Sequence, residues 1–170
     1  MNGPELHLTL NHLPVLLPPL GLILVAAGMY FSSLDLRKAG LCFFIAGGLL
    51  AIPTYLSGEP AEVIVKNYPG VSRRAITEHQ DAAFISLIAV EITAVAALIT
   101  FILLLKKKFV PRSVWSLLLV AGVITFALFV KTAHFGGHIR HEEIQTPEER
   151  ERFDAGMTSL SRPVENERYA

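Results

Sequence analysis

The chain has 170 residues, 52% of them hydrophobic, and its 15 basic and 15 acidic residues give a formal net charge of zero. This composition is too apolar for most soluble domains and is typical of a small integral membrane protein, while the charge balance gives no reason to expect a nucleic-acid partner. The single cysteine, Cys42, excludes an intrachain disulfide and a haem attached through a C-x-x-C-H motif.

Four long apolar runs follow one another along the chain, at residues 8–31, 40–56, 82–105 and 114–133. Each run approaches or exceeds the ~20 residues that a helix needs to cross the hydrocarbon core of a bilayer. We therefore predict an all-α, integral membrane four-helix bundle over residues 1–145. A polar, partly disordered C-terminal tail is expected over residues 146–170.

The first run contains the pair Pro18–Pro19, which removes two backbone donors and predicts a kink. The second run carries Gly40, Gly47 and Gly48. Small residues let neighbouring helices approach closely in a membrane, and they also leave room for a flat cofactor. Close packing is the favoured interpretation.

The loop between the second and third runs is punctuated by glycine and proline, and residues 61–66 within it are compatible with a short helix at the membrane interface. Ser72 is suited to cap the next helix at its N-terminus. The third helix would then begin before the membrane and carry His79 on an outer extension.

Glu91 lies about eleven residues into the third run, roughly 16 Å deep at the rise of an α-helix. An ionisable group at that depth is costly and by default marks a functional position. Glu91 is therefore a candidate proton relay. Contact with a partner subunit, or simple packing beside a hydroxyl or water, are the alternatives.

The fourth run ends at a Gly136–Gly137 pair, where we predict a break or tight bend in the helix. If the helix continues instead, His134, His138 and His141 form a stripe along one face.

Basic residues in the two short connecting loops predict the orientation. The loop after the first run has two basic residues against one acid, and the loop after the third run has only basic residues. Because short basic loops face the cytoplasm, we expect both termini and the longer loop outside, in the inner membrane of a bacterium. The loop residues are Asp35, Arg37, Lys38, Lys106, Lys107, Lys108 and Arg112.

An up-and-down arrangement of the four helices gathers the plausible metal ligands on one side of the membrane. All six histidines fall on that outer side and none on the other. The residues gathered there are His7, His12, Glu59, Glu62, His79, Asp81, His134, His138 and His141.

Histidines on facing helices of a bundle are the usual ligands of haem b. We predict that His79 binds haem together with His12 or His141, with His134 as a further candidate. His12 and His79 would belong to diagonal helices. The corresponding function is a membrane electron-transfer subunit that exchanges electrons with quinol or a periplasmic cytochrome.

Two other functions are open. Glu59 and Glu62 together with His12, His79 and His141 form a carboxylate–imidazole set that suits a zinc, iron or manganese ion. The chain is also compatible with a non-catalytic structural or assembly subunit of a respiratory membrane complex. In that case each histidine is an interfacial residue near lipid headgroups.

Three segments resemble the small bacterial membrane proteins grouped as domain of unknown function 2231. These segments are Leu-Asn-His-Leu-Pro at 10–14, Gly-Glu-Pro-Ala-Glu at 58–62 with Glu-His at 78–79, and Gly-Gly-His-Ile-Arg-His-Glu-Glu at 136–143. The resemblance implies a four-span fold and places the family-type residues at His12, Glu59, Glu62, His79 and His141. It implies no activity, and Leu13 stands where the pattern more often has Phe.

Overall fold

The computed structural model describes residues 3–68 and 70–139, and every regular element in this part of the chain is an α-helix. The helices are α1 (Gly3–Leu10), α2 (His12–Tyr30), α3 (Leu34–Leu56), α4 (Gly58–Val65), α5 (Arg73–Leu105) and α6 (Arg112–His138). Four segments are long and apolar enough to cross a membrane: Gly3–Tyr30, Leu34–Val65, Arg73–Leu105 and Arg112–His138. The prediction of four apolar helices is confirmed.

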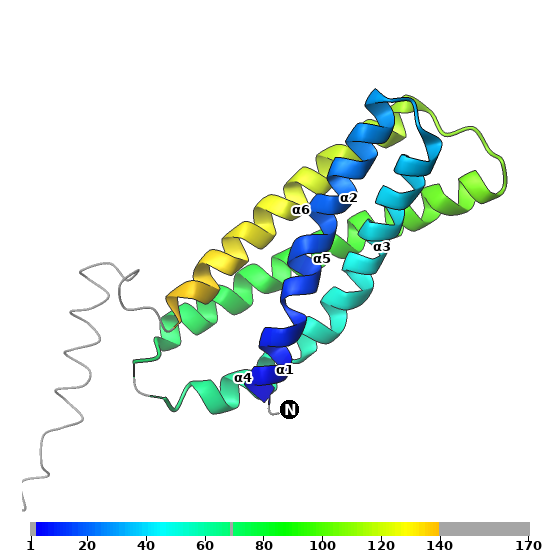
Figure 1. Ribbon diagram of the computed structural model, residues 1–170. Helices are drawn as coiled ribbons and strands as arrows, with labels where there is room; N and C mark the ends of the chain where they lie inside the picture. The colour runs from blue at the N-terminus through cyan, green and yellow to red at the C-terminus, as the bar shows by residue number, and fades with distance from the viewer. Residues whose placement is uncertain (1–2, 69, 140–170) are drawn as a thin grey trace, which may run out of the picture.

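The four long helices lie side by side as a bundle, with α1 and α4 together at one end (Figure 1). Helix α2 packs against α3 and α6, and α5 packs against the same two helices, so α2 and α5 occupy diagonal positions. At the end that carries α1 and α4, the backbone N–H of Ser72 donates to Ile139 O at 3.2 Å. This bond joins the start of α5 to the end of α6.

Serine caps fix the starts of two long helices. The Ser72 hydroxyl accepts the Ala75 N–H at 3.2 Å, and the Ser33 hydroxyl accepts the Leu36 N–H at 3.4 Å. Such caps satisfy a backbone donor that the first helical turn leaves free. The predicted cap at Ser72 is confirmed, and α5 does begin before its apolar run. The short helix expected near residues 61–66 is present as α4.

Glycines bring α2 and α3 into close backbone contact. A Cβ placed on Gly40 would lie 2.7 Å from Gly21 O and 2.6 Å from Val25 Cγ2, and one on Gly47 would lie 3.2 Å from Pro18 Cγ. The helix continues through Pro18 and Pro19, and Pro18 is buried at this interface. The glycines of α3 therefore serve helix packing, as the favoured interpretation expected.

Hydroxyl pairs connect α5 with α6. Ser86 and Thr132 lie 2.8 Å apart through their hydroxyl oxygens, and Thr93 and Thr125 lie 3.0 Å apart. All four side chains are buried. In a membrane protein, hydrogen bonds of this kind hold helices together where lipid gives no hydrophobic drive for association.

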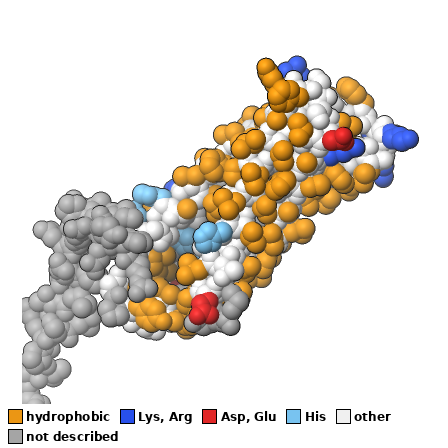
Figure 2. Space-filling model, in the orientation of Figure 1, with side chains coloured by type: hydrophobic (Ala, Val, Ile, Leu, Met, Phe, Trp, Pro, Cys, Tyr) orange, Lys and Arg blue, Asp and Glu red, His pale blue; other side chains and the backbone are white. Residues whose placement is uncertain are grey.

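The outer surface is apolar along most of the bundle, and the charged groups gather at its ends (Figure 2). Several lysine and arginine side chains gather at one end, and histidines lie toward the other, which also carries Lys66, Arg73 and Arg74. Exposed residues such as Ile92, Leu117 and Val120 show this apolar surface. The separation of basic and histidine-bearing ends agrees with the up-and-down arrangement expected from the sequence.

The predicted break at Gly136–Gly137 is wrong, because α6 continues to His138. A Cβ on Gly136 would lie 3.2 Å from both Cε1 and Nδ1 of His79. Gly136 therefore allows α5 and its histidine ring to approach α6 closely. The glycine is therefore needed for close packing. The sequence alone does not distinguish such a glycine from one that ends or bends a helix.

Candidate histidine site at one end of the bundle

His79 is held by a backbone carbonyl of the neighbouring helix. The ring is half-buried on α5, and its Nδ1 donates to Thr132 O on α6 at 2.9 Å. Because a carbonyl oxygen only accepts hydrogen bonds, this contact places a hydrogen on Nδ1. In the neutral ring, the lone pair is then on Nε2.

His7 is held in the same way from the other side of the bundle. Its Nδ1 lies 2.9 Å from Ser57 Oγ and 3.2 Å from Thr54 O, at the junction of α3 and α4. The Ser57 hydroxyl itself donates to Thr54 O at 2.6 Å, so its oxygen is free to accept from His7. This network again places the hydrogen of a neutral ring on Nδ1 and the lone pair on Nε2.

The two rings lie next to each other although 71 positions separate them in the chain. Their centroids are 6.3 Å apart, and their planes are nearly perpendicular, at 88°. A metal ion about 2.0–2.1 Å from an imidazole nitrogen lies roughly 3.2 Å from the ring centroid, so two imidazoles on opposite sides of one ion have centroids about 6.4 Å apart. The observed centroid separation of His7 and His79 is close to this value.

The surroundings of the pair explain how two distant segments bring these rings together. Helix α1 packs on α4, and Gly3 comes so close to the Pro60 carbonyl that a Cβ would lie 2.8 Å from its oxygen. Gly58 leaves ordinary contact distance to His7, 3.7 Å from Cε1. Small residues thus stand beside both histidines, with Gly136 against His79.

His12 is the first residue of α2. It lies on an exposed face at the start of α2, and its Nδ1 donates to Leu8 O, one turn earlier, at 2.8 Å. Within residues 3–68 and 70–139, no ring contact joins His12 to another histidine. Its role as a ligand stays a prediction.

The remaining predicted histidines are on α6 or beyond it. His134 and His138 stand one helical turn apart, with ring centroids separated by 4.4 Å. His134 is exposed and His138 is half-buried. His141 lies outside the described residues, so its predicted role as a ligand is untested.

The predicted carboxylate ligands do not join the histidines. Glu59 is exposed in the first turn of α4, and Asp81 is exposed on α5. Glu62 instead accepts a hydrogen bond of 2.6 Å from Gln80 Nε2, which ties α4 to α5. Among the residues that the structure describes, no group of three or more His, Cys, Asp or Glu side chains is placed to hold a metal ion.

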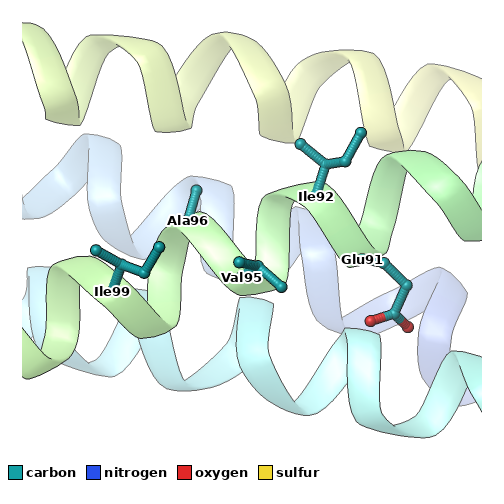
Figure 3. Close-up of a pocket in the computed structure, with 5 residues that line it drawn as sticks. All are labelled: Glu91, Ile92, Val95, Ala96 and Ile99. Atoms are coloured by element: carbon teal, nitrogen blue, oxygen red, sulfur yellow. The ribbon is translucent and has the colours of Figure 1, made fainter.

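Glu91 lies far from the histidine pair, about 18 Å from His79 along α5 at the rise of a helix. Its side chain points toward α3, where a Cβ on Gly48 would lie 3.5 Å from Glu91 Oε2 (Figure 3). The Oε1 atom is buried and has no hydrogen-bond partner among the described residues. Beside it, an apolar groove runs along α5 past Ile92, Val95, Ala96 and Ile99.

His7 is the site residue that the predicted ligand set omitted. The sequence placed it on the correct side of the membrane, but it precedes the first apolar run and gave no sign of its partner. The signal that would have found it is indirect. A histidine just before one span and a Thr54–Ser57 pair at the end of the next supply a donor and acceptors on the same side of the membrane.

Comparisons of the chain with protein-family models, with curated proteins and with solved structures found no match. The resemblance to domain of unknown function 2231, with the residue roles that it implies, therefore remains a prediction. The fold and the site define a class by themselves: a helical bundle with four apolar spans and a pair of carbonyl-anchored histidines at one end.

Proposed function

We propose that this chain is a multi-pass protein of a bacterial inner membrane that binds haem b at its histidine-bearing end and transfers electrons there. The observation that carries the proposal is the His7–His79 pair. Two rings from different spans stand at the separation of opposed ligands, and each donates Nδ1–H to a fixed oxygen.

The number of available ligands favours haem over a bare metal ion. Haem iron needs one or two side chains from the protein, since the porphyrin supplies the rest of its coordination. A structural zinc site usually needs four protein ligands and a catalytic one three. The described residues offer a pair of histidines but no cluster of three ligand side chains, so the carboxylate–imidazole interpretation has less support.

The chain's own residues orient the ligands and set their basicity. A hydrogen bond from Nδ1 to a carbonyl fixes the tautomer and the ring orientation, and it raises the basicity of Nε2. Thr132 O does this for His79, and Ser57 with Thr54 does it for His7. Bound haem would supply reversible one-electron chemistry, with quinol or a periplasmic cytochrome as the exchange partner.

The orientation belongs to the same proposal. His7 on α1 and His79 near the start of α5 lie at the end of the bundle opposite the two short basic loops that follow α2 and α5 (Figure 1). With the basic loops in the cytoplasm, both termini are outside and the histidine pair faces the periplasm. Electron exchange with an external carrier would then need no passage across the bilayer.

A series of alanine variants tests the proposal on protein purified from haem-sufficient bacterial membranes. We expect a haem b spectrum with two histidine ligands in the wild type. His79→Ala and His7→Ala should each abolish or severely weaken haem retention. His134→Ala, which removes an exposed histidine from the same end, is the matched control and should retain the haem.

Two further variants connect the spectrum to the geometry. Gly136→Ala places a Cβ 3.2 Å from the His79 ring, so the ring must shift and the haem spectrum should change. Gly58→Ala brings a Cβ only to 3.7 Å from His7 and should leave the spectrum unaltered. Loss of haem in His12→Ala but not in His7→Ala would transfer the ligand role to His12. Folded wild-type protein without haem contradicts the electron-transfer function and favours a structural or assembly subunit.

A further inference from the structure

The end of α6 carries a second pair of histidines, separate from His7 and His79. His134 and His138 are four residues apart and therefore project from the same face of the helix. Their ring centroids are 4.4 Å apart, with the planes inclined at 61°. Helical spacing of this kind is what places two imidazoles on one metal ion in known zinc-binding helices.

His138 has an unsatisfied polar atom. Its Nε2 is buried, and within the described part of the chain it has no hydrogen-bond partner. A buried polar atom without a partner is costly and uncommon, and an ion is one of the groups that resolve it. His134 is exposed, so its ring can be reached from outside the bundle.

The ring separation suits two adjacent positions on one ion. An ion lies roughly 3.2 Å from the centroid of each ligating imidazole, so bond angles of about 90–109° place the two centroids about 4.5–5.2 Å apart. The observed 4.4 Å lies just below this range, and a small rotation of the exposed His134 ring would bring the pair into it. The His7–His79 pair, at 6.3 Å, does not fit adjacent positions.

The C-terminal end of α6 favours a cation, while the ammonium group of Lys131 on the same helix opposes one. His138 is the last residue of α6, where the unpaired carbonyls give the helix end a partial negative charge. The nearby cation on the same helix, Lys131, lies over the Phe135 ring at 5.7 Å from its centroid. That contact stabilises the ammonium group on the ring face.

We propose that His134 and His138 bind a divalent transition-metal ion of the copper or nickel class. The two imidazoles occupy adjacent positions, and the remaining positions are open to water or to a ligand from outside the protein. Imidazole ligands suit both metals. This site is independent of the proposed haem site, since the two share no residue.

Copper(II) is the probe of choice, since it binds nitrogen ligands most tightly among these ions. Purified full-length protein, free of any histidine tag, is titrated with Cu²⁺ and examined by electron paramagnetic resonance. We expect one equivalent of copper with the signature of two imidazole nitrogens. His134→Ala should weaken its binding at least about tenfold, since even residues that only support a ligand cost 10–100-fold when removed.

Matched variants distinguish this site from others. His134 is exposed, so His134→Ala should leave the fold intact, while His138→Ala serves as a second test with circular dichroism to confirm folding. His12→Ala removes an exposed histidine on another helix and should not change the affinity. The titration is repeated in a His79→Ala background, where the same equivalent should persist. Equal copper affinity in wild type, His134→Ala and His138→Ala would overturn the proposal.

Discussion

At the histidine-bearing end of the bundle, neighbouring residues fix the positions of the His7 and His79 rings. Each ring of the His7–His79 pair is fixed by its Nδ1, and each has a glycine beside it, Gly58 or Gly136. The sequence identified His79 as a candidate because all six histidines fall on one side of the predicted bundle. It gave no means of pairing His7 with it, because that contact depends on how α1 folds onto α4, at a distance of many residues along the chain.

Glu91 is an ionisable residue in largely apolar surroundings. One carboxyl oxygen is buried without a partner, beside an apolar groove. Proteins retain such groups at functional positions at some cost in stability. Packing beside a hydroxyl was one alternative for Glu91, and Oε1 has no hydrogen-bond partner among the described residues. Its role in proton transfer or in contact with a partner subunit stays a proposal.

Replacing Glu91 by leucine should therefore stabilise the bundle. We expect Glu91→Leu to raise the free energy of unfolding by up to about 1 kcal/mol, since a partly enclosed polar group without a hydrogen bond is replaced by an apolar one. Unfolding in detergent micelles by heat or sodium dodecyl sulfate measures the change. Glu91→Gln, which keeps the shape and the polarity, is the control and should show no gain. A loss of stability in Glu91→Leu would reveal a hydrogen-bonded partner.

At the scale of elements, the apolar runs predicted the four long helices well. Contacts between helices determined the features that the runs did not predict. The runs end within a few residues of the helices at Tyr30, Leu56 and Leu105, because a glycine or basic loop stops the apolar pattern there. They did not reveal α1 as a separate short helix. They also suggested an end to α6 at Gly136, where close packing against His79 explains the glycine.

The hydroxyl pairs between α5 and α6 give a second prediction. In a double-mutant cycle with Thr93→Val and Thr125→Val, we expect a coupling free energy of about 0.6 kcal/mol, the average for hydrogen bonds between membrane helices. Valine keeps nearly the same shape, so the cycle isolates the hydroxyl contact at 3.0 Å. Unfolding of the single and double variants in micelles provides the four required free energies.

Thr100 provides the comparison for this cycle. Its hydroxyl donates to Ala96 O on its own helix at 2.8 Å, and in the described part of the chain it makes no hydrogen bond to α6. Thr100→Val combined with Thr125→Val should therefore be additive. Coupling of similar size in both cycles would mean that the measured effect comes from general helix packing.

For the whole molecule, the distribution of charge predicts which end faces the cytoplasm. We expect a cysteine at Asn67 to react with a membrane-impermeant reagent from outside intact cells, and a cysteine at Phe109 to remain protected until the cells are opened. Both side chains are exposed in the structure, and neither is a helix cap. Ser72 and Ser33 are unsuitable for this labelling, because their hydroxyls cap α5 and α3.

The native cysteine must be removed first, because Cys42 is exposed and free. Cys42→Ala is a small change on the outer face of α3 and provides the unlabelled background. The reverse labelling pattern, with Phe109 reactive and Asn67 protected, would place the histidine end in the cytoplasm. It would also rule out a periplasmic electron carrier as the direct partner.

The hydroxyl pairs of α5 and α6 have a mechanical consequence for the histidine end. Ser86 and Thr93 lie two turns apart, as do Thr125 and Thr132, so sliding one helix along the other by a single turn would separate both pairs. The two pairs therefore fix the register of α5 against α6. The hydrogen bond to Thr132 O fixes the His79 ring relative to α6. His7, on a short helix held mainly by α4, is the adjustable member of the pair. Any reorganisation on ligand binding should therefore occur in α1, with the α5–α6 hairpin acting as the fixed reference.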